Sequence, residues 1–485
     1  MPISNRHSLF VLRRGFLVLL GLGLLSGCAH FTARPISPEG SLAQYDRRAL
    51  SSPGLATFLK ANNVSVPAPD GPWSLKALTL TALYYQPSLA EARARLLAAQ
   101  AAQITARERR NPSLSLAPAY DSGVPSAPSP WIVPISIRWP IATAGRRRDR
   151  IARARHLALA ARWNLVKTVW DVRSTLRTAL LDLYAARRTE ALLGRQEQAL
   201  RTTLTLLQGQ VRAGALSNIE VTRARVELDH TVLAREAEAG RVRQARIELA
   251  KGLGVPLRAL ADIKLSNRPF RMFPEKLTQP QVRQQALLGR ADVRAALERY
   301  AATQSALQLQ IARQWPRLNL GPGFAWNAQL AGDREWTLGL GLTLPILNRN
   351  QGPIAEARAQ RRLAAARFLA VQSAAIAEID GALAAYRTAL LRVKTAVSLQ
   401  RSLRAQFRAI DARVLAGEDQ PLDLSEAKIA LIAGDRDLLA TRIEAQRALG
   451  RLENGVESSL TFKPLALHDA GDPSLLPCQA TRTCG

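Results

Sequence analysis

Three carboxylates lie within six residues of one another on a chain that is otherwise strongly basic. The 485 residues contain 67 Lys and Arg against 38 Asp and Glu, a formal net charge of +29. Glu418, Asp419 and Asp423 therefore form a local negative cluster, whereas a turn needs at most one carboxylate to cap the helix that follows it. Such a cluster attracts cations or pairs with arginines such as Arg413.

A second turn with the same pattern comes earlier in the chain. Gly214 matches Gly417 at an offset of 417 − 214 = 203, and Glu220 matches Asp423 at the same offset. We expect the two glycines to end helices and Ser217 to cap the next helix. Capping is the simpler interpretation of Ser217 and the glycines. The carboxylates of both turns are also candidates for gating.

The motifs of catalysis are missing from the sequence. There is no phosphate-binding G-x-x-x-x-G-K-[ST], no G-x-S-x-G and no pair of histidines with metal-ligand spacing. Met272 is the only methionine after the initiator, so thioether ligands for soft metals are lacking within one chain. We predict no enzyme activity, no cofactor and no metal site. We expect the isolated histidines to be surface or packing residues: His30, His156, His230 and His468.

The N-terminus predicts export and lipid attachment. Arginines precede an apolar core of eleven residues, Gly15 to Leu25, which is too short to span a bilayer as a helix. The sequence Leu-Ser-Gly-Cys that ends at Cys28 resembles the lipobox of bacterial lipoproteins, in which the cysteine is acylated. Ala29 follows where an Asp would indicate retention at the inner membrane, so the resemblance implies the outer membrane. The simpler alternative is a chance cysteine after an ordinary signal peptide.

Cys478 and Cys484 lie in a short C-terminal tail. In an oxidising compartment the expected state is a local disulfide, because the tail offers too few other ligands for a metal site.

The positive charge first suggests nucleic acid, but its distribution does not support this function. The arginines are spread along the predicted helices, without a patch interleaved with aromatic residues, and an export signal removes the chain from nucleic acid. We therefore interpret them as a solvated helical surface.

The chain is predicted to contain a duplicated unit. Pro112 matches Pro316 at an offset of 316 − 112 = 204, and Pro140 matches Pro345 at 345 − 140 = 205, close to the offset of the turns. Each unit is predicted to contain a helix, two strands, a very long helix, a tight turn and a helix, in this order. In the first unit the helices are 74–110, 142–212 and 217–252, with strands 114–121 and 131–139; in the second they are 279–314, 353–416 and 421–453, with strands 318–327 and 336–344.

These elements predict the domain organisation of the whole chain. The predicted segments are a signal peptide (1–27), a linker that begins with the lipidated cysteine (28–73), the first repeat (74–255), a connection (256–278), the second repeat (279–456) and a C-terminal tail (457–485). The two shorter helices of a unit together equal the length of the long one, about 100 Å, so they can stack end to end beside it. Leucine and valine at seven-residue spacing, as in Val169, Leu176 and Leu183, predict coiled packing.

The strands alternate large apolar residues with small or polar ones. In the strand that begins at Trp336, Trp and Leu occupy one face and Gly and Thr the other, which suits lipid outside and water inside. Pro345 is expected to end this strand before the long helix. The predicted junctions between strands and helices are Pro140, Gly145, Pro345, Asn348, Asn350 and Gly352.

Four strands cannot close a barrel, and open strand edges are not tolerated in lipid. Several chains must therefore share one barrel, and three chains would supply twelve strands. The predicted fold is mainly α with a membrane β-barrel, in which a trimeric α-helical tunnel lies under a shared twelve-stranded barrel.

The lipobox, the duplicated unit and the segment Leu344 to Gly352 together resemble the TolC family of outer-membrane efflux proteins, and the last segment is most similar to the heavy-metal-efflux, CzcC-like branch. The resemblance covers about residues 74 to 456. It implies a homotrimer in the outer membrane whose helices extend into the periplasm of a Gram-negative bacterium. It also implies docking of the helical tips on a periplasmic adaptor and an inner-membrane pump of the resistance-nodulation-division type.

The function predicted on this basis is a passive export duct for heavy-metal cations. Within the same architecture, drug efflux or type I protein secretion remains an alternative, since the chain is rich in Arg and has no His or Met clusters. From another class, a structural coiled-coil lipoprotein remains open, although the paired amphipathic strands argue against it.

Overall fold

The computed structural model describes most of the chain between residues 31 and 460. The described ranges are 31–67, 71–123, 130–261, 263–274, 283–284, 289–327 and 333–460. The predictions that concern the signal peptide, Cys28, Cys478 and Cys484 lie outside the described residues.

The chain divides into two compact units, Met1–Arg48 and Ala49–Gly485. The first contains helix α2 (Pro38–Asp46), whose N-terminus is capped by Ser37. The second begins with α3 (Pro53–Ala61), which Ser52 caps and which buries Leu55 and Leu59 completely. The segment predicted to be a linker therefore contains two short helices. Ser-Pro at each helix start and apolar residues four apart in α3 are the signals that it contained.

Longer helices follow in the described part of the second unit. They are α4 (Leu75–Tyr85), α5 (Pro87–Arg107), α6 (Arg146–Arg212), α7 (Asn218–Leu253), α9 (Ala291–Ala312), α10 (Gln351–Leu415) and α11 (Pro421–Val456). The predicted helix 74–110 is broken at Gln86, because Pro87 has no N–H to donate and restricts the residue before it to extended backbone.

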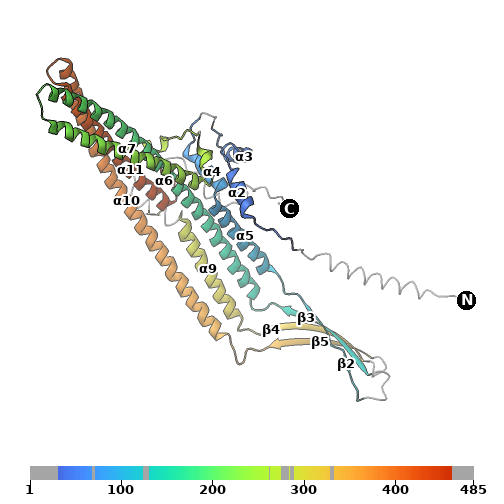
Figure 1. The fold of residues 1–485 in the computed structure, drawn as a ribbon. Coiled ribbons are helices and arrows are strands. Elements are labelled where there is room, and N and C mark those ends of the chain that lie inside the picture. The colour runs from blue at the N-terminus through green and yellow to red at the C-terminus, as the bar shows by residue number, and fades with distance from the viewer. Residues whose placement is uncertain are drawn as a thin grey trace. The chain divides into compact units, whose positions relative to one another are not determined.

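The shorter helices pack along the sides of the two long helices. Helix α6 has 67 residues and packs against α5 and α7, and α10 has 65 residues and packs against α9 and α11, as Figure 1 shows. At 1.5 Å per residue each long helix is about 100 Å. Val169, Leu176 and Leu183 are buried on α6, so the predicted heptad stripe is a core stripe.

The short helices of each repeat meet end to end. In the first repeat the Gln86 side chain, before α5, donates to the carbonyls of Lys251 and Gly252 at the end of α7, at 2.8 and 3.0 Å. In the second, the Glu457 carboxylate, after α11, accepts from the N–H of Ala291 at the start of α9 at 2.7 Å. These contacts place each pair in line beside its long helix.

The residue that ends the stacked helix has left-handed backbone in both repeats. It is Gly254 after α7, with φ +74°, and Glu457 after α11, with φ 47°. The offset is 457 − 254 = 203, the same as between the tight turns. A Cβ at Gly254 would lie 2.9 Å from the carbonyl oxygen of Tyr85, so only glycine fits there.

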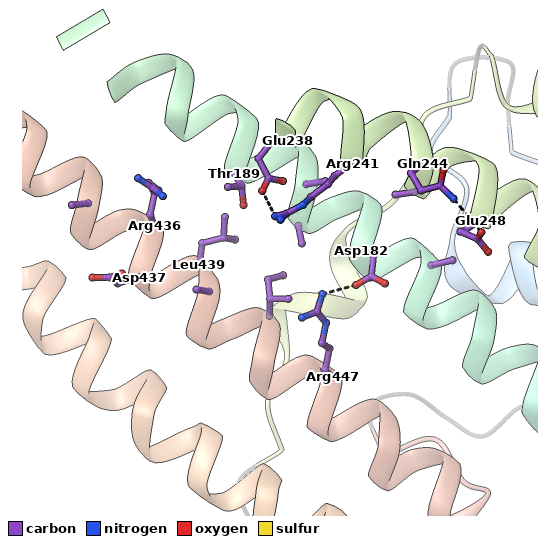
Figure 2. Close-up of a pocket in the computed structure, with 17 residues that line it drawn as sticks. Asp182, Thr189, Glu238, Arg241, Gln244, Glu248, Arg436, Asp437, Leu439 and Arg447 are labelled. Carbon is purple, nitrogen blue, oxygen red and sulfur yellow. Dashed lines mark hydrogen bonds and ion pairs between the residues drawn. The ribbon is translucent and has the colours of Figure 1, made fainter. Parts of the chain in front are cut away.

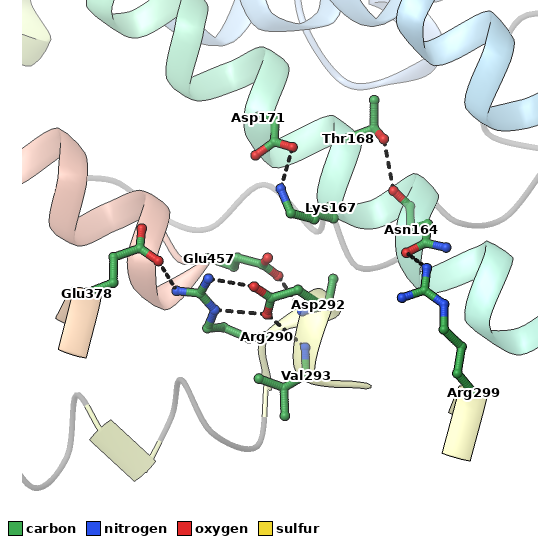
Figure 3. A network of polar contacts seen from close by, with 11 residues as sticks. Asn164, Lys167, Thr168, Asp171, Arg290, Asp292, Val293, Arg299, Glu378 and Glu457 are labelled. Carbon is green, nitrogen blue, oxygen red and sulfur yellow. Dashed lines mark hydrogen bonds and ion pairs between the residues drawn. The ribbon is translucent and has the colours of Figure 1, made fainter. Parts of the chain in front are cut away.

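Charged side chains join the second stacked pair to its neighbours (Figure 3). Arg290 donates to both oxygens of Asp292, at 3.0 Å from Nε and 2.6 Å from Nη2, and its Nη1 lies 2.8 Å from Oε2 of Glu378 on α10. Burial acts to lower the pKa of Arg290, but the bonds and charges of these two carboxylates outweigh it and raise the pKa. Burial raises the pKa of Glu457 to about 7; the Ala291 N–H, Arg290 and Lys167 oppose this rise.

A second buried cluster joins α6 to α11. Oε2 of Glu453, whose side chain is 0% exposed, lies 3.2 Å from Arg173 and 3.4 Å from Arg177. Arg177 also donates to the backbone and side-chain oxygens of Gln446, both at 2.8 Å. Burial is the main reason that the pKa of Arg177 is lowered.

The strands lie at the end of the bundle opposite the tight turns (Figure 1). They form one antiparallel sheet with the order β1-β3-β4-β5, in which β2 also pairs with β3. Its members are β1 (Ser113–Leu116), β2 (Ala119–Tyr120), β3 (Trp131–Ile141), β4 (Arg317–Asn327) and β5 (Asp333–Thr343). The predicted strand 114–121 is interrupted at Ala117-Pro118, because proline cannot donate to the ladder.

Candidate functional site

The sheet has one apolar face and one face of small and polar residues. Strand register places Ile135, Phe324 and Trp336 in one row, and Ser136, Gly323 and Thr337 in the next. The apolar row is continued by Leu338, Leu340, Leu342 and Leu344, all of them exposed. A sheet that exposes a row of leucines and tryptophans in water would aggregate, so this face requires a lipid environment.

The length of the strands matches a membrane. Strands β3, β4 and β5 each have 11 residues, and a tilted transmembrane strand needs about 9–11. Trp139 and Trp315 lie at the end of the sheet next to the helices, and Trp131, Trp326 and Trp336 lie toward the other end. Two aromatic belts therefore bracket the apolar face, as at the two interfaces of a bilayer.

Both edges of the sheet are open within the described residues. β1 and β5 are the terminal strands of the order β1-β3-β4-β5, and each pairs on one side only. An unpaired edge in lipid leaves backbone N–H and C=O groups without partners, each of which costs several kcal/mol. The sheet is therefore one part of a larger closed barrel.

Left-handed residues mark both transitions from strand to long helix. Gly145, with φ +73°, precedes α6, and Asn350, with φ 61°, precedes α10, at an offset of 350 − 145 = 205. Asn348 accepts from the N–H of Asn350 at 2.8 Å, and Asn350 Nδ2 donates to the carbonyl of Gln310 at 2.7 Å. Pro345 lies two residues after the end of β5.

Two residues assigned to these junctions lie inside regular elements. Pro140 belongs to β3 and pairs with Asn319, and Gly352 is the second residue of α10. Proline is tolerated in the strand near its end, and the left-handed Asn350 starts the helix two residues earlier than expected.

Sequence reasoning missed Arg146, which follows Gly145 and ties the first junction to the second repeat. Its Nε donates to the carbonyl of Ala312 at 3.0 Å, and its Nη2 donates to the carbonyl of Trp315. Ala312 is the last residue of α9, so the bond to its carbonyl caps that helix. An arginine in the first turn of α6, where the helix dipole disfavours it, was the available signal.

The tight turns at the far end of the bundle have matching backbone geometry. Gly214 and Gly417 have φ of +76° and +79°. The N–H of the next residue closes the turn onto the carbonyl five residues back, Ala215 to Gln210 at 2.9 Å and Glu418 to Arg413 at 2.9 Å. Each turn is therefore a Schellman motif, which favours glycine at the left-handed position.

The helices that leave the turns are capped differently. Ser217 accepts from the N–H of Ile219 at 3.3 Å before α7, and Glu220 pairs with Arg223 at 2.9 Å. Before α11, Gln420 and Asp423 form a capping box, in which Asp423 accepts from the N–H of Gln420 at 3.0 Å.

The acidic cluster separates into three different environments. Asp423 serves the capping box, and Asp419, mostly buried, forms an ion pair with Arg413 across its own turn. Glu418 is exposed, and its carboxylate has no partner among the described residues. The two turns are joined by Gln210, which donates to Gln420 at 2.9 Å.

A groove of about 730 Å³ lies between α6, α7 and α11 (Figure 2). Its walls carry paired charges, among them Arg447 with Asp182 at 2.8 Å and Arg241 with Glu238. Within the described residues, no group of three or more His, Cys, Asp or Glu is placed to hold a metal ion. His156 lies 2.7 Å from a carboxylate oxygen of Glu298 and is not isolated.

Comparison with known proteins identifies similar chains. The family described as "Outer membrane efflux protein" matches residues 79–255 and 282–455. The sequence is 28% identical over 314 residues to the cobalt-zinc-cadmium resistance protein CzcC of Cupriavidus metallidurans. The aligned stretch covers 64% of this chain and 69% of that protein.

Solved structures have a similar fold. The outer membrane channel CmeC of Campylobacter jejuni aligns with a TM-score of 0.65 at 16% identity, over 93% of this chain and 98% of that chain. CusC aligns with a TM-score of 0.63 at 18% identity, over 79% and 91% of the two chains.

Proposed function

This chain belongs to the outer membrane efflux protein family, and we propose that three copies of it form the outer membrane duct of a tripartite system that exports heavy-metal cations. The protein is an outer membrane channel component with an α-helical tunnel below a β-barrel, and its helices extend into the periplasm. The trimeric state, the partner proteins and the transported cation are proposals.

The observation that carries the trimer is the sheet with two open edges, in which β1 and β2 both pair with β3 as two parts of one interrupted strand, so that each chain supplies four strands to a barrel. Three such sheets joined edge to edge give twelve strands, which is within the range of membrane barrels. Helix α10 supports the same arrangement. It contains a stretch that is long and apolar enough to cross a membrane, of which 22% is buried within one chain. In a trimer this surface packs against a neighbouring copy, which removes it from water.

Oligomeric state tests the trimer directly. The protein extracted in mild detergent should have the mass of three chains and migrate as a heat-modifiable band on electrophoresis. A stable solubilised monomer that keeps its full β content would contradict the proposal, because its strand edges would then be unpaired.

The cargo is inferred from the relative whose name records resistance to cobalt, zinc and cadmium. We infer that divalent cations pass through the duct, driven by a pump in the inner membrane and collected through a periplasmic adaptor. A strain that lacks this chain should lose resistance to these cations and regain it on complementation. Loss of drug resistance or of protein secretion, with metal resistance unchanged, would favour the alternative ducts of the same architecture.

The tight turns are the proposed periplasmic mouth and docking surface. Six turns from three chains would ring the tunnel, so that Glu418 from each chain, together with Asp419, forms an acidic ring. The pair between Asp419 and Arg413 supports a role in holding the turn at Gly417 closed in each chain.

Glu418→Gln changes charge alone, because this carboxylate has no partner among the described residues, whereas Asp419→Asn also breaks the pair with Arg413. In planar bilayers both variants should lower cation selectivity, and only Asp419→Asn should raise conductance. Glu426→Gln, at an exposed position on α11, is the matched control. Wild-type selectivity and conductance in both turn variants, with the trimer intact, would show that these carboxylates serve the turns only.

A further inference from the structure

A cluster of arginines lies where the helices meet the sheet. Arg109 and Arg110 follow α5, and Arg146, Arg150 and Arg153 occupy the first turns of α6. Only Asn111 and Pro112 separate Arg110 from the first residue of β1, so at most about 10 Å of chain lies between this arginine and the membrane strand. The cluster therefore lies at the helix side of the aromatic belt formed by Trp139 and Trp315.

Part of this charge is used to fix the ends of the helices. Arg150 donates to the carbonyls of Ala106 and Glu108 at 2.9 and 2.7 Å, and Arg147 donates to the carbonyl of Arg107 at 2.6 Å. These bonds cap the C-terminus of α5 and hold it against the start of α6.

The remaining arginines have no such role. Arg109, Arg110 and Arg153 are exposed, and their side chains have no hydrogen bond or ion pair within the described part of the chain. Several like charges lie close together in this cluster. The pKa of Arg146 is lowered first by burial and then by the nearby guanidinium groups of Arg317, Arg313 and Arg110. Holding cations close together costs free energy, which an anion bound from outside the chain would offset.

A groove lies between the free arginines. It has a volume of about 500 Å³, and Arg109, Arg110, Arg150 and Arg153 line it together with the apolar side chain of Leu157. Glu108 is the one acidic residue of the lining. Beyond the groove, Leu114 and Leu116 of β1 are exposed on the strand that leads into the membrane.

We propose that this groove binds the phosphate headgroup of an anionic phospholipid in the periplasmic leaflet of the outer membrane, with its acyl chains along β1. Three observations favour this ligand over a soluble anion. The groove has a cationic rim and an apolar wall, its lining residue Arg110 is four residues before the exposed Leu114 of β1, and it lies on the helix side of the aromatic belt, where headgroups are expected. Guanidinium groups suit phosphate because they donate two hydrogen bonds in one plane.

The test uses the full-length protein purified as its native oligomer in detergent. Native mass spectrometry would count bound phosphatidylglycerol during a titration, against phosphatidylcholine with the same acyl chains. The test variant is Arg109→Gln/Arg110→Gln/Arg153→Gln, which leaves the capping residue Arg150 in place. The matched control is Arg225→Gln/Arg243→Gln/Arg246→Gln, the same charge change at exposed positions on α7, away from the sheet.

Wild type and control should bind phosphatidylglycerol alike and phosphatidylcholine weakly. A basic residue near an anionic membrane surface contributes roughly fivefold, so the test variant should bind phosphatidylglycerol on the order of a hundredfold more weakly. Lysine at the same three positions should retain most of the affinity.

Three results would overturn the proposal. The first is equal binding of phosphatidylglycerol by the test variant and wild type. The second is equal weakening in the control, which would indicate a general charge effect. The third is dissociation of the test variant into monomers in phosphatidylcholine, which would show that these arginines contact the neighbouring copy at the open edge of β1.

Discussion

Glu457→Gln should remove a pH-dependent loss of stability at the junction between α11 and α9. The Glu457 side chain is buried, the residue being 4% exposed, and it accepts a 2.7 Å bond from the N–H of Ala291. Its pKa is raised from 4.5 to about 7, first by burial and then by Asp292, against the opposing effects of the Ala291 N–H, Arg290 and Lys167. Glutamine has the same shape and can accept the same bond without carrying a charge.

The sign of the effect follows from proton binding. Between pH 4.5 and about 7 the native state holds a proton on Glu457 that the unfolded chain has lost. The free energy of unfolding of the wild type therefore falls as the pH rises through this window, and the contribution is fully present only below it. The variant lacks this dependence, so it should match the wild type at low pH and exceed it above about pH 7.

The magnitude follows from the same values. A pKa rise from 4.5 to about 7 corresponds to about 3 kcal/mol. A chain of 485 residues has an unfolding entropy of about 1 kcal/mol/K, so the variant should melt about 3 °C higher than the wild type above pH 7.

The assay is thermal unfolding followed by circular dichroism, on detergent-solubilised protein at steps from about pH 4 to about pH 8. Glu426→Gln is the control, because it removes one carboxylate from an exposed position on the same helix. A variant less stable than the wild type above pH 7 would refute the reasoning, since it would mean that Arg290 and Lys167 stabilise the Glu457 anion. A difference that does not change with pH would refute it as well.

Two further predictions concern the buried cluster and the lipid anchor. Glu453→Gln removes the carboxylate that faces buried Arg173 and Arg177, so it should lower stability by about 3–5 kcal/mol, whereas Glu444→Gln, in an exposed pair with Arg392, should cost at most about 1 kcal/mol. Equal melting temperatures of these two variants would contradict the first prediction. Cys28→Ala should abolish palmitate labelling and weaken anchoring while the barrel still assembles; unchanged labelling of the variant would rule out acylation at this residue.

Element types could be predicted from local sequence because they depend on local physical rules. Alternation of Leu with Gly and Thr marks the strand that contains Leu338 and Leu340, and apolar residues at heptad spacing mark α6. The left-handed positions at the turns were also predictable, since Gly214 and Gly417 are the residues that adopt positive φ without strain. The duplication is equally visible in the sequence, because matching prolines, glycines and carboxylates recur at an offset near 204 residues.

Local rules also account for the errors. Pro87 and Pro118 interrupt a helix and a strand that were expected to be continuous, although each proline was visible in the sequence. The two helices before residue 73 were not predicted, because each has only nine residues and α2 has no buried residue to produce a pattern.

Only the tertiary structure decided which distant groups meet. Nothing local to Gln86 indicates that it bonds to Gly252, 166 residues later, or that Glu457 caps a helix that begins 166 residues earlier at Ala291. The sequence by itself determined the elements and their repetition, because propensity, period and capping act within a few residues. The structure decided the roles of the charged residues, because burial and electrostatic partners depend on segments that are brought together only by packing.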